Sequence, residues 1–426
     1  MHLPKNRLPH RDLWLKAHVY LGLAVGLLFA LLGLTGSLSI VRDGLDELLN
    51  PRLLVEQSAG QYQPLDKIMA AVRAAHPSRH DEWVLEMPRS PTSMVTAWYE
   101  KPYETFGERY APLMVSVNPY TAEVAASRFW GHTFATGIED LHTNLQLGLF
   151  GAKTVGLLGL ALAVSVVSGL YLWWPGLDGL RRAFTIRPLA IANLFHDLHG
   201  LAGLAVAPIL LLLALTGFHL ANPKILETLA GASGMGHGED GPAIRSTAVP
   251  NDRPVSLAEA AVIARGPFPH AEVRRIATPA GEDGTYRVNL RRPGEVNIRH
   301  PVTMVWVDRW SGQIRAVRNP NQFTGGQAFV SRLWPLHTGE AFGAAGRVLW
   351  FFAGLAPLLL YATGLTQWLI KRGVLQDRLV DWRALRCHWA NTSIVLRQLA
   401  LILGQWSWHA VRWLAEQARQ IARQMK

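Results

Sequence analysis

The sequence predicts a mainly α-helical membrane protein, a bundle of four transmembrane helices built from two tandem repeats, with two α+β units outside the membrane. Three observations predict this fold: four long runs without charged side chains, a repeat of the first half of the chain in the second, and alternating apolar and polar residues between the runs. With 49% hydrophobic and 17% charged residues and a mean hydropathy of +0.12, the 426-residue chain fits a mixture of bilayer and water-exposed parts.

Each uncharged run has at least 23 residues, enough to cross a hydrocarbon core of about 30 Å as a helix. The runs are 19–41, 154–177, 198–223 and 348–370. From them we expect transmembrane helices at 19–41, 142–174, 196–223 and 337–370. The second and fourth helices are expected to extend outside the membrane.

Basic residues gather on one side of the predicted membrane. Segments 1–18, 175–195 and 371–426 hold 17 of the 42 basic residues but only 5 of the 31 acidic ones. The positive-inside rule makes this side, with both termini, cytoplasmic. Segments 42–141 and 224–336 are then outside, and the tail carries an amphipathic helix around 398–411. The net charge of +11 therefore reflects topology and does not predict nucleic-acid binding.

The two halves of the chain match residue by residue. In the spans, His18, Gly22, Thr35 and Gly36 recur 181 positions later as His199, Gly203, Thr216 and Gly217; His142, Gly148 and Gly169 recur 195 positions later as His337, Gly343 and Gly364. The outer segments match with an offset of 190, each predicting a short helix (65–75 and 257–265) followed by strands. Both repeats have the same orientation, so their pseudo-two-fold axis should run along the membrane normal.

Several classes of function have no support in the sequence. The single cysteine, Cys387, excludes a disulfide framework and any site with four cysteine ligands. There is no HExxH motif, P-loop or nucleophile elbow, so hydrolase and ATPase functions are not predicted.

The candidate functional residues are histidines at the ends of the spans, where ionisable groups are costly and often functional. They are His18, His196 and His199 at the inner ends and His142, His219 and His337 at the outer ends. The repeat pairs His18 with His199 and His142 with His337, whereas His196 and His219 correspond to leucines. Equivalent helices facing each other across the axis would bring one histidine pair together at each end.

Two imidazoles are too few ligands for tetrahedral zinc, but they are what a six-coordinate haem needs. Gly22 and Gly203 lie four residues after His18 and His199, on the same helix face, and would leave room for a flat macrocycle. Close packing between helices is the alternative role for these glycines. His219 is the stronger rival ligand at the outer level, and His196 is a rival at the inner level.

On these residues the chain resembles the PepSY-associated transmembrane family of bacterial iron-regulated membrane proteins, over residues 10–372. The resemblance rests on the His-x3-Gly and Leu-Thr-Gly phrases of the spans that carry His18 and His199, and on the helices of His142 and His337. Residues 118–124 and 308–314, which end the outer units, resemble PepSY repeats.

The resemblance implies an inner-membrane protein with periplasmic PepSY units and two b-type haems. The haem iron ligands would be His18 with His199 and His142 with His337. It further implies an oxidoreductase that reduces ferric siderophores or other ferric chelates. Some relatives carry a fused reductase module, but no G-x-G-x-x-G motif lies here between a strand and a helix, so we expect a separate cytoplasmic protein or a quinol as electron donor.

Two other functions stay open. A PepSY-bearing, membrane-anchored binding or regulatory protein would have no redox activity, and its paired histidines would be unexplained. A di-haem cytochrome b reducing another acceptor, such as a quinone or copper, would use the same ligands. An anchor should purify without colour, which separates it from both haem proteins.

Overall fold

A computed structural model describes residues 10–55, 60–179, 183–186, 190–235, 242–247, 249 and 253–377. The chain divides into a large unit, residues 1–184 with 198–365, and a small unit, residues 185–197 with 366–426. The amphipathic helix predicted around 398–411 in the cytoplasmic tail lies outside the described residues.

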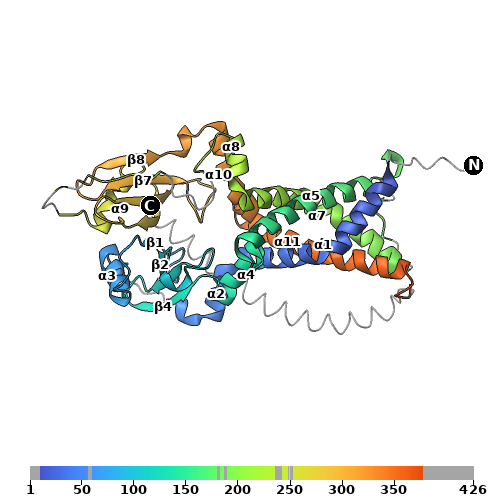
Figure 1. Ribbon diagram of the computed structural model, residues 1–426, viewed down its shortest axis with the longest axis horizontal. Helices are drawn as coiled ribbons and strands as arrows, with labels where there is room; N and C mark the ends of the chain where they lie inside the picture. The colour runs from blue at the N-terminus through green and yellow to red at the C-terminus, as the bar shows by residue number, and fades with distance from the viewer. Residues whose placement is uncertain are drawn as a thin grey trace, which may run out of the picture. The chain divides into compact units, whose positions relative to one another are not determined.

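Four helices of the described chain are long and apolar enough to cross a membrane, which confirms the predicted spans (Figure 1). They are α1 (Arg11–Ile40), α5 (Gly148–Trp173), α7 (Ile191–Ala221) and α11 (Gly343–Lys371). Helices α1, α7 and α11 are longer than the uncharged runs because polar residues at their ends continue the helix. Their length is enough to cross a bilayer. A helix suits this environment because every backbone hydrogen bond is made inside the helix.

The spans pack in a ring, each against two neighbours, through small residues. Gly33 of α1 lies so close to α11 that a Cβ there would be 2.3 Å from the carbonyl oxygen of Gly354. Gly159 of α5 makes a similar approach to Ala214 of α7. Helix α7 in turn contacts α11 at Gly203, and α1 packs along α5. Close backbone approach gives van der Waals contact that apolar lipid cannot replace.

Outside the spans, the described residues form one antiparallel sheet of eight strands in the order β4-β3-β2-β1-β5-β6-β7-β8. The strands are β1 (Val84–Glu86), β2 (Val95–Tyr99), β3 (Leu113–Val117), β4 (Val124–Phe129), β5 (Glu272–Ala277), β6 (Thr285–Arg291), β7 (Thr303–Asp308) and β8 (Ile314–Arg318). The sequence predicts two α+β units, and it does not predict how they join. Their strands meet at the pair β1–β5, where Leu85 lies opposite Ile276.

One face of this sheet makes the core with two helices, α3 (Leu65–Ala75) and α9 (Leu257–Arg265). A single row of paired residues crosses that face and is fully buried: Val115, Ala97, Leu85, Ile276, Val288 and Val305. Both helices begin and end where the sequence predicts them. Strict alternation along each strand sends these apolar side chains to one face.

Short helices join the spans to the sheet: α2 (Arg42–Leu49), α4 (Phe134–Asn144), α8 (Pro223–Leu229) and α10 (Gly325–Thr338). Helix α4 does not continue into α5, and α10 does not continue into α11, although the sequence predicts single helices starting at 142 and 337. Leu145 and Gln146 have positive φ between α4 and α5, and Gly148 and Gly343 have positive φ where the spans begin. Such a conformation ends a helix and favours glycine.

Two equivalent turns differ by one charge. The side chain of Asn118 accepts hydrogen bonds from the backbone N–H groups of Tyr120 and Thr121, and that of Asp308 does the same with Trp310 and Ser311. Asp308 also pairs with Arg315 at 2.8 Å. Burial raises the pKa of Asp308, but these donors and Arg315 outweigh it and lower the pKa to about 2.

We predict that Asp308→Asn keeps the turn and removes a pH-dependent part of stability. A carboxyl group whose pKa is lower in the folded state stabilises above its unfolded pKa, about 4, and loses that contribution as pH falls toward 2. Wild-type unfolding free energy should therefore decline by ~2 kcal/mol over that range. In the variant this part of the decline should be absent, as measured by tryptophan fluorescence during denaturant unfolding at each pH. Parallel curves for the two proteins would contradict the prediction.

Candidate functional site

The candidate site consists of two histidine pairs. His18 of α1 faces His199 of α7 with ring centroids 6.2 Å apart and ring planes at 88°. His142 of α4 faces His337 of α10 with centroids 6.3 Å apart and ring planes at 39°. The structure thus brings together the four histidines in the pairs that the repeat predicts. Along α1, Gly36 beside His142 lies about 27 Å of helix rise beyond His18, so the pairs occupy opposite ends of the bundle.

In the inner pair, each ring is held by its Nδ1 atom. Nδ1 of His18 lies 3.0 Å from the carbonyl oxygen of Ser165 and 3.0 Å from the hydroxyl of Ser168. Nδ1 of His199 lies 3.0 Å from the hydroxyl of Thr363, which donates its own proton to the carbonyl of Leu359. A carbonyl only accepts, and a hydroxyl that has donated must accept, so Nδ1 carries the proton in both rings.

The outer pair follows the same rule. Nδ1 of His142 donates to the carbonyl oxygen of Leu32 at 2.9 Å. Nδ1 of His337 donates to the hydroxyl of Thr216 at 2.8 Å, and that hydroxyl donates to Leu212. In the neutral form of each ring, Nε2 therefore carries the lone pair. This is the tautomer of a metal-ligating histidine, whose other nitrogen donates to a second partner.

Each of the four rings also lies against a glycine of a neighbouring helix. A Cβ at these glycines would approach the Cε1 atom of the ring to between 2.7 and 3.3 Å: Gly169 with His18, Gly364 with His199, Gly36 with His142 and Gly217 with His337. Our sequence reasoning gave no role to these glycines or to Ser168, Thr216 and Thr363. The repeat could have identified them, since Gly36 matches Gly217, Gly169 matches Gly364 and Ser168 matches Thr363.

The spacing within each pair can be tested against a metal bound between the rings. Two imidazoles that ligate one ion from opposite sides have centroids about 6.2 Å apart, because each nitrogen lies about 2.0 Å from the metal and about 1.1 Å from its ring centre. The observed 6.2 and 6.3 Å agree with this value. Within the described ranges, no three His, Cys, Asp or Glu side chains gather as a metal site, so each pair offers two such ligands and no third.

The remaining predicted residues lie in different surroundings. No heavy atom of the described chain is within 4 Å of where a Cβ on Gly22 would stand, and Gly203 approaches only Leu360, at 3.7 Å. His196 is exposed on α7. His219 is buried, with its Nδ1 atom lacking a hydrogen-bond partner. The ring contacts of the described chain pair neither His196 nor His219 with another histidine.

A comparison with protein families matches the chain to the PepSY-associated TM region over residues 15–371. The match covers all four spans and the sheet between them. No curated protein matches the chain.

We predict opposite effects of alanine at two glycines of α1. Gly36→Ala places a Cβ 2.7 Å from the His142 ring and should destabilise the protein by ~1–3 kcal/mol, since the ring and its bond to Leu32 must move. Gly22→Ala meets no protein atom and should be neutral or stabilise by up to about 1 kcal/mol, because alanine favours the helix. Thermal unfolding of the detergent-solubilised variants, produced under haem limitation, measures both. Equal changes in stability for the two variants would show that the His142 ring does not require a glycine at position 36.

Proposed function

The chain belongs to the PepSY-associated transmembrane family, and from this membership and the two histidine pairs we propose that it is a di-haem oxidoreductase. It would hold two b-type haems and pass electrons across the bacterial inner membrane to ferric iron in siderophores or other ferric chelates in the periplasm. The observation that carries the proposal is the outer pair: two half-buried histidines on separate helices, with ring centroids 6.3 Å apart, each fixed through Nδ1.

In this function the protein acts through ligation and position. His18 with His199, and His142 with His337, would supply the axial ligands through Nε2. Haem iron supplies one-electron redox chemistry, since it is stable as Fe(III) and Fe(II). The carbonyl and hydroxyl partners at Nδ1 fix the ring orientation and raise the basicity of Nε2, which tunes such a site.

The four glycines let each ring approach a neighbouring helix, so that a ring cannot turn away from its partner. The open space beside Gly22 supports a flat ligand against α1.

The two ends of the bundle have different roles in the proposal. The excess of basic residues at the termini and in segment 175–195 supports a cytoplasmic position for the His18–His199 end. Electrons would enter there from a separate cytoplasmic protein or a quinol. The His142–His337 end, next to the helices that lead to the sheet, would give one electron to each Fe(III). Reduction aids release, because hard oxygen chelators bind Fe(II) less strongly than Fe(III).

We expect the detergent-purified protein to show two low-spin ferric haems that electron paramagnetic resonance distinguishes. Ring planes at 88° in the inner pair should give a strongly anisotropic signal, whereas planes at 39° in the outer pair should give a rhombic one. His142→Ala or His337→Ala should remove the rhombic signal and one haem per chain, and His18→Ala or His199→Ala should remove the other.

Exposed His196→Ala is the matched control and should keep both haems. Wild-type haem content after loss of His142, or loss of a haem in His219→Ala with both predicted pairs intact, would refute the outer ligand assignment. A colourless protein, even after haem is supplied during expression, would favour the membrane-anchored binding protein.

Electron transfer across the membrane is tested in sealed proteoliposomes. A ferric chelate is enclosed in the lumen, and a reductant that cannot cross the membrane is added to the outer solution. In inside-out vesicles, which place the outer pair in the lumen, we expect lumenal Fe(III) reduction that follows haem content. His18→Ala should abolish this reduction while leaving the outer haem in place. Equal rates with and without the inner haem would contradict a route through both sites.

A further inference from the structure

The outer histidines sit on helices that are not continuous with the spans. His142 is on α4, which ends at Asn144 before a break with positive φ at Leu145 and Gln146. His337 is near the end of α10, which Gly339 terminates with a φ of 76°. The spans do not carry these two rings, although His142 donates to Leu32 of α1 and His337 donates to Thr216 of α7. Contacts between α4, α10 and the rest of the chain add to these two bonds.

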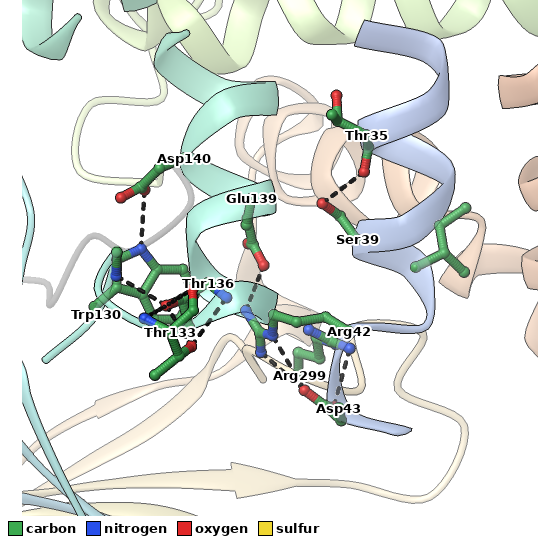
Figure 2. Close-up of polar contacts among 12 residues, drawn as sticks. Thr35, Ser39, Arg42, Asp43, Trp130, Thr133, Thr136, Glu139, Asp140 and Arg299 are labelled. Atoms are coloured by element: carbon green, nitrogen blue, oxygen red, sulfur yellow. Dashed lines mark hydrogen bonds and ion pairs between the residues drawn. The ribbon is translucent and has the colours of Figure 1, made fainter. Parts of the chain in front are cut away.

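A chain of ion pairs runs from α4 to the residues that follow α10, and Figure 2 shows its part from Glu139 to Arg299. Glu139, three residues before His142 on α4, contacts Arg42 at 2.5 Å. Arg42 pairs with Asp43 at 3.0 Å, and Asp43 pairs with Arg299 at 3.0 Å. Arg299 reaches Glu340, three residues after His337, at 3.5 Å. Glu340 also accepts hydrogen bonds from the backbone N–H groups of Ile298 and Arg299.

The same series of ion pairs also contacts the middle of the sheet. Arg89 contacts Asp43 and also pairs with Glu86 of β1 at 2.5 Å. Glu86 lies opposite Arg275 of β5 and pairs with it at 2.7 Å. Because β1 and β5 join the two halves of the sheet, the ion pairs connect that junction to both outer histidines.

Most of these groups are shielded from water, although the side chain of Asp43 is 40% exposed. The side chains of Glu139, Arg299 and Glu340 are 17%, 10% and 4% exposed. Burial raises the pKa of Asp43, but the charges of Arg42, Arg299 and Arg89 outweigh it and hold that pKa well below its usual range. Removing one member leaves a partner buried and unpaired, which costs far more than loss of a surface pair.

We propose that Arg42, Asp43 and Arg299 are positioning residues for the outer histidine pair, holding α4 and the end of α10 at the spacing that two axial ligands require. The inference rests on the proposed function, because it assumes that the pair holds haem. It makes the outer site, and not the inner one, depend on the sheet. The inner site is then an internal control in every measurement, because both of its histidines lie within spans.

The test is Arg299→Gln in the full-length protein. We expect the rhombic signal of the outer pair to shift and the outer haem content to fall severalfold, while the anisotropic inner signal stays at the wild-type position and amount. The midpoint potential of the remaining outer haem should fall, since a positive charge is lost near it. Arg299→Lys keeps the charge without the planar fork and should restore the outer signal in part.

Arg245→Gln is the matched control, since it breaks an arginine–carboxylate pair, with Asp283, that is largely exposed. A readout without haem is a double-mutant cycle of Glu139→Gln and Glu340→Gln in thermal unfolding. The two glutamates are linked through the series of ion pairs. We therefore expect the effects of the two substitutions on the unfolding free energy to be non-additive.

The outcomes separate the inference from the proposed function. Wild-type protein with no haem overturns the proposed function and this inference with it. Two haems in wild type, with an unchanged outer signal in Arg299→Gln, overturns the inference and leaves the function standing. Equal loss of both haems in that variant also overturns it, because the effect would then be general instability. Additive effects in the cycle overturn the linkage between the two glutamates.

Discussion

The close approach of an imidazole ring to a helix backbone is the constraint on which the rest of this structure depends. Gly36, Gly169, Gly217 and Gly364 each admit one ring, and any side chain at these positions would occupy the space of a Cε1 atom. A ring held this close can donate from Nδ1 to the backbone or to a hydroxyl of the same helix, as His142 does to Leu32. Its Nε2 atom then carries the lone pair, and the ring faces a second histidine. Helix spacing, ring tautomer and pair geometry therefore follow from the same few residues.

The two ends of the bundle meet this constraint in different ways. At the inner end the histidines belong to α1 and α7, so their spacing is set by packing of the spans, with small residues such as Gly33 and Gly354 at the interfaces. At the outer end they belong to α4 and α10, which glycine and positive-φ residues separate from the spans. A network of ion pairs around Asp43 links these helices to the sheet. The outer site is thus built from short helices outside the spans whose rings are bonded to α1 and α7.

Much of the fold was predictable, for physical reasons that are visible in the sequence. A run without charge that is long enough to cross a bilayer allows few structures other than a helix, so all four spans were found. Helices α3 and α9 were located from local periodicity and have the predicted bounds. The breaks after Asn144 and Thr338 were missed, because the apolar pattern continues across them and the positive φ of Leu145 and Gln146 has no signal in residue type. The joining of β1 to β5 was also missed, since strand pairing between distant segments has no local pattern.

The sequence by itself determined the identity of the paired histidines, because duplication places equivalent residues on equivalent helices whatever their exact packing. It also determined the membrane topology that we propose, through the distribution of arginine and lysine. Only the tertiary structure decided which nitrogen each ring uses, which glycines receive the rings, and how Arg299 comes to lie between Asp43 and Glu340. These features depend on contacts between residues as far apart in the sequence as 43 and 299. Such residues are not equivalent positions of the repeat, so the repeat does not predict their contact. Local sequence selects the elements, whereas the positions of side chains between elements depend on the packing of the whole chain.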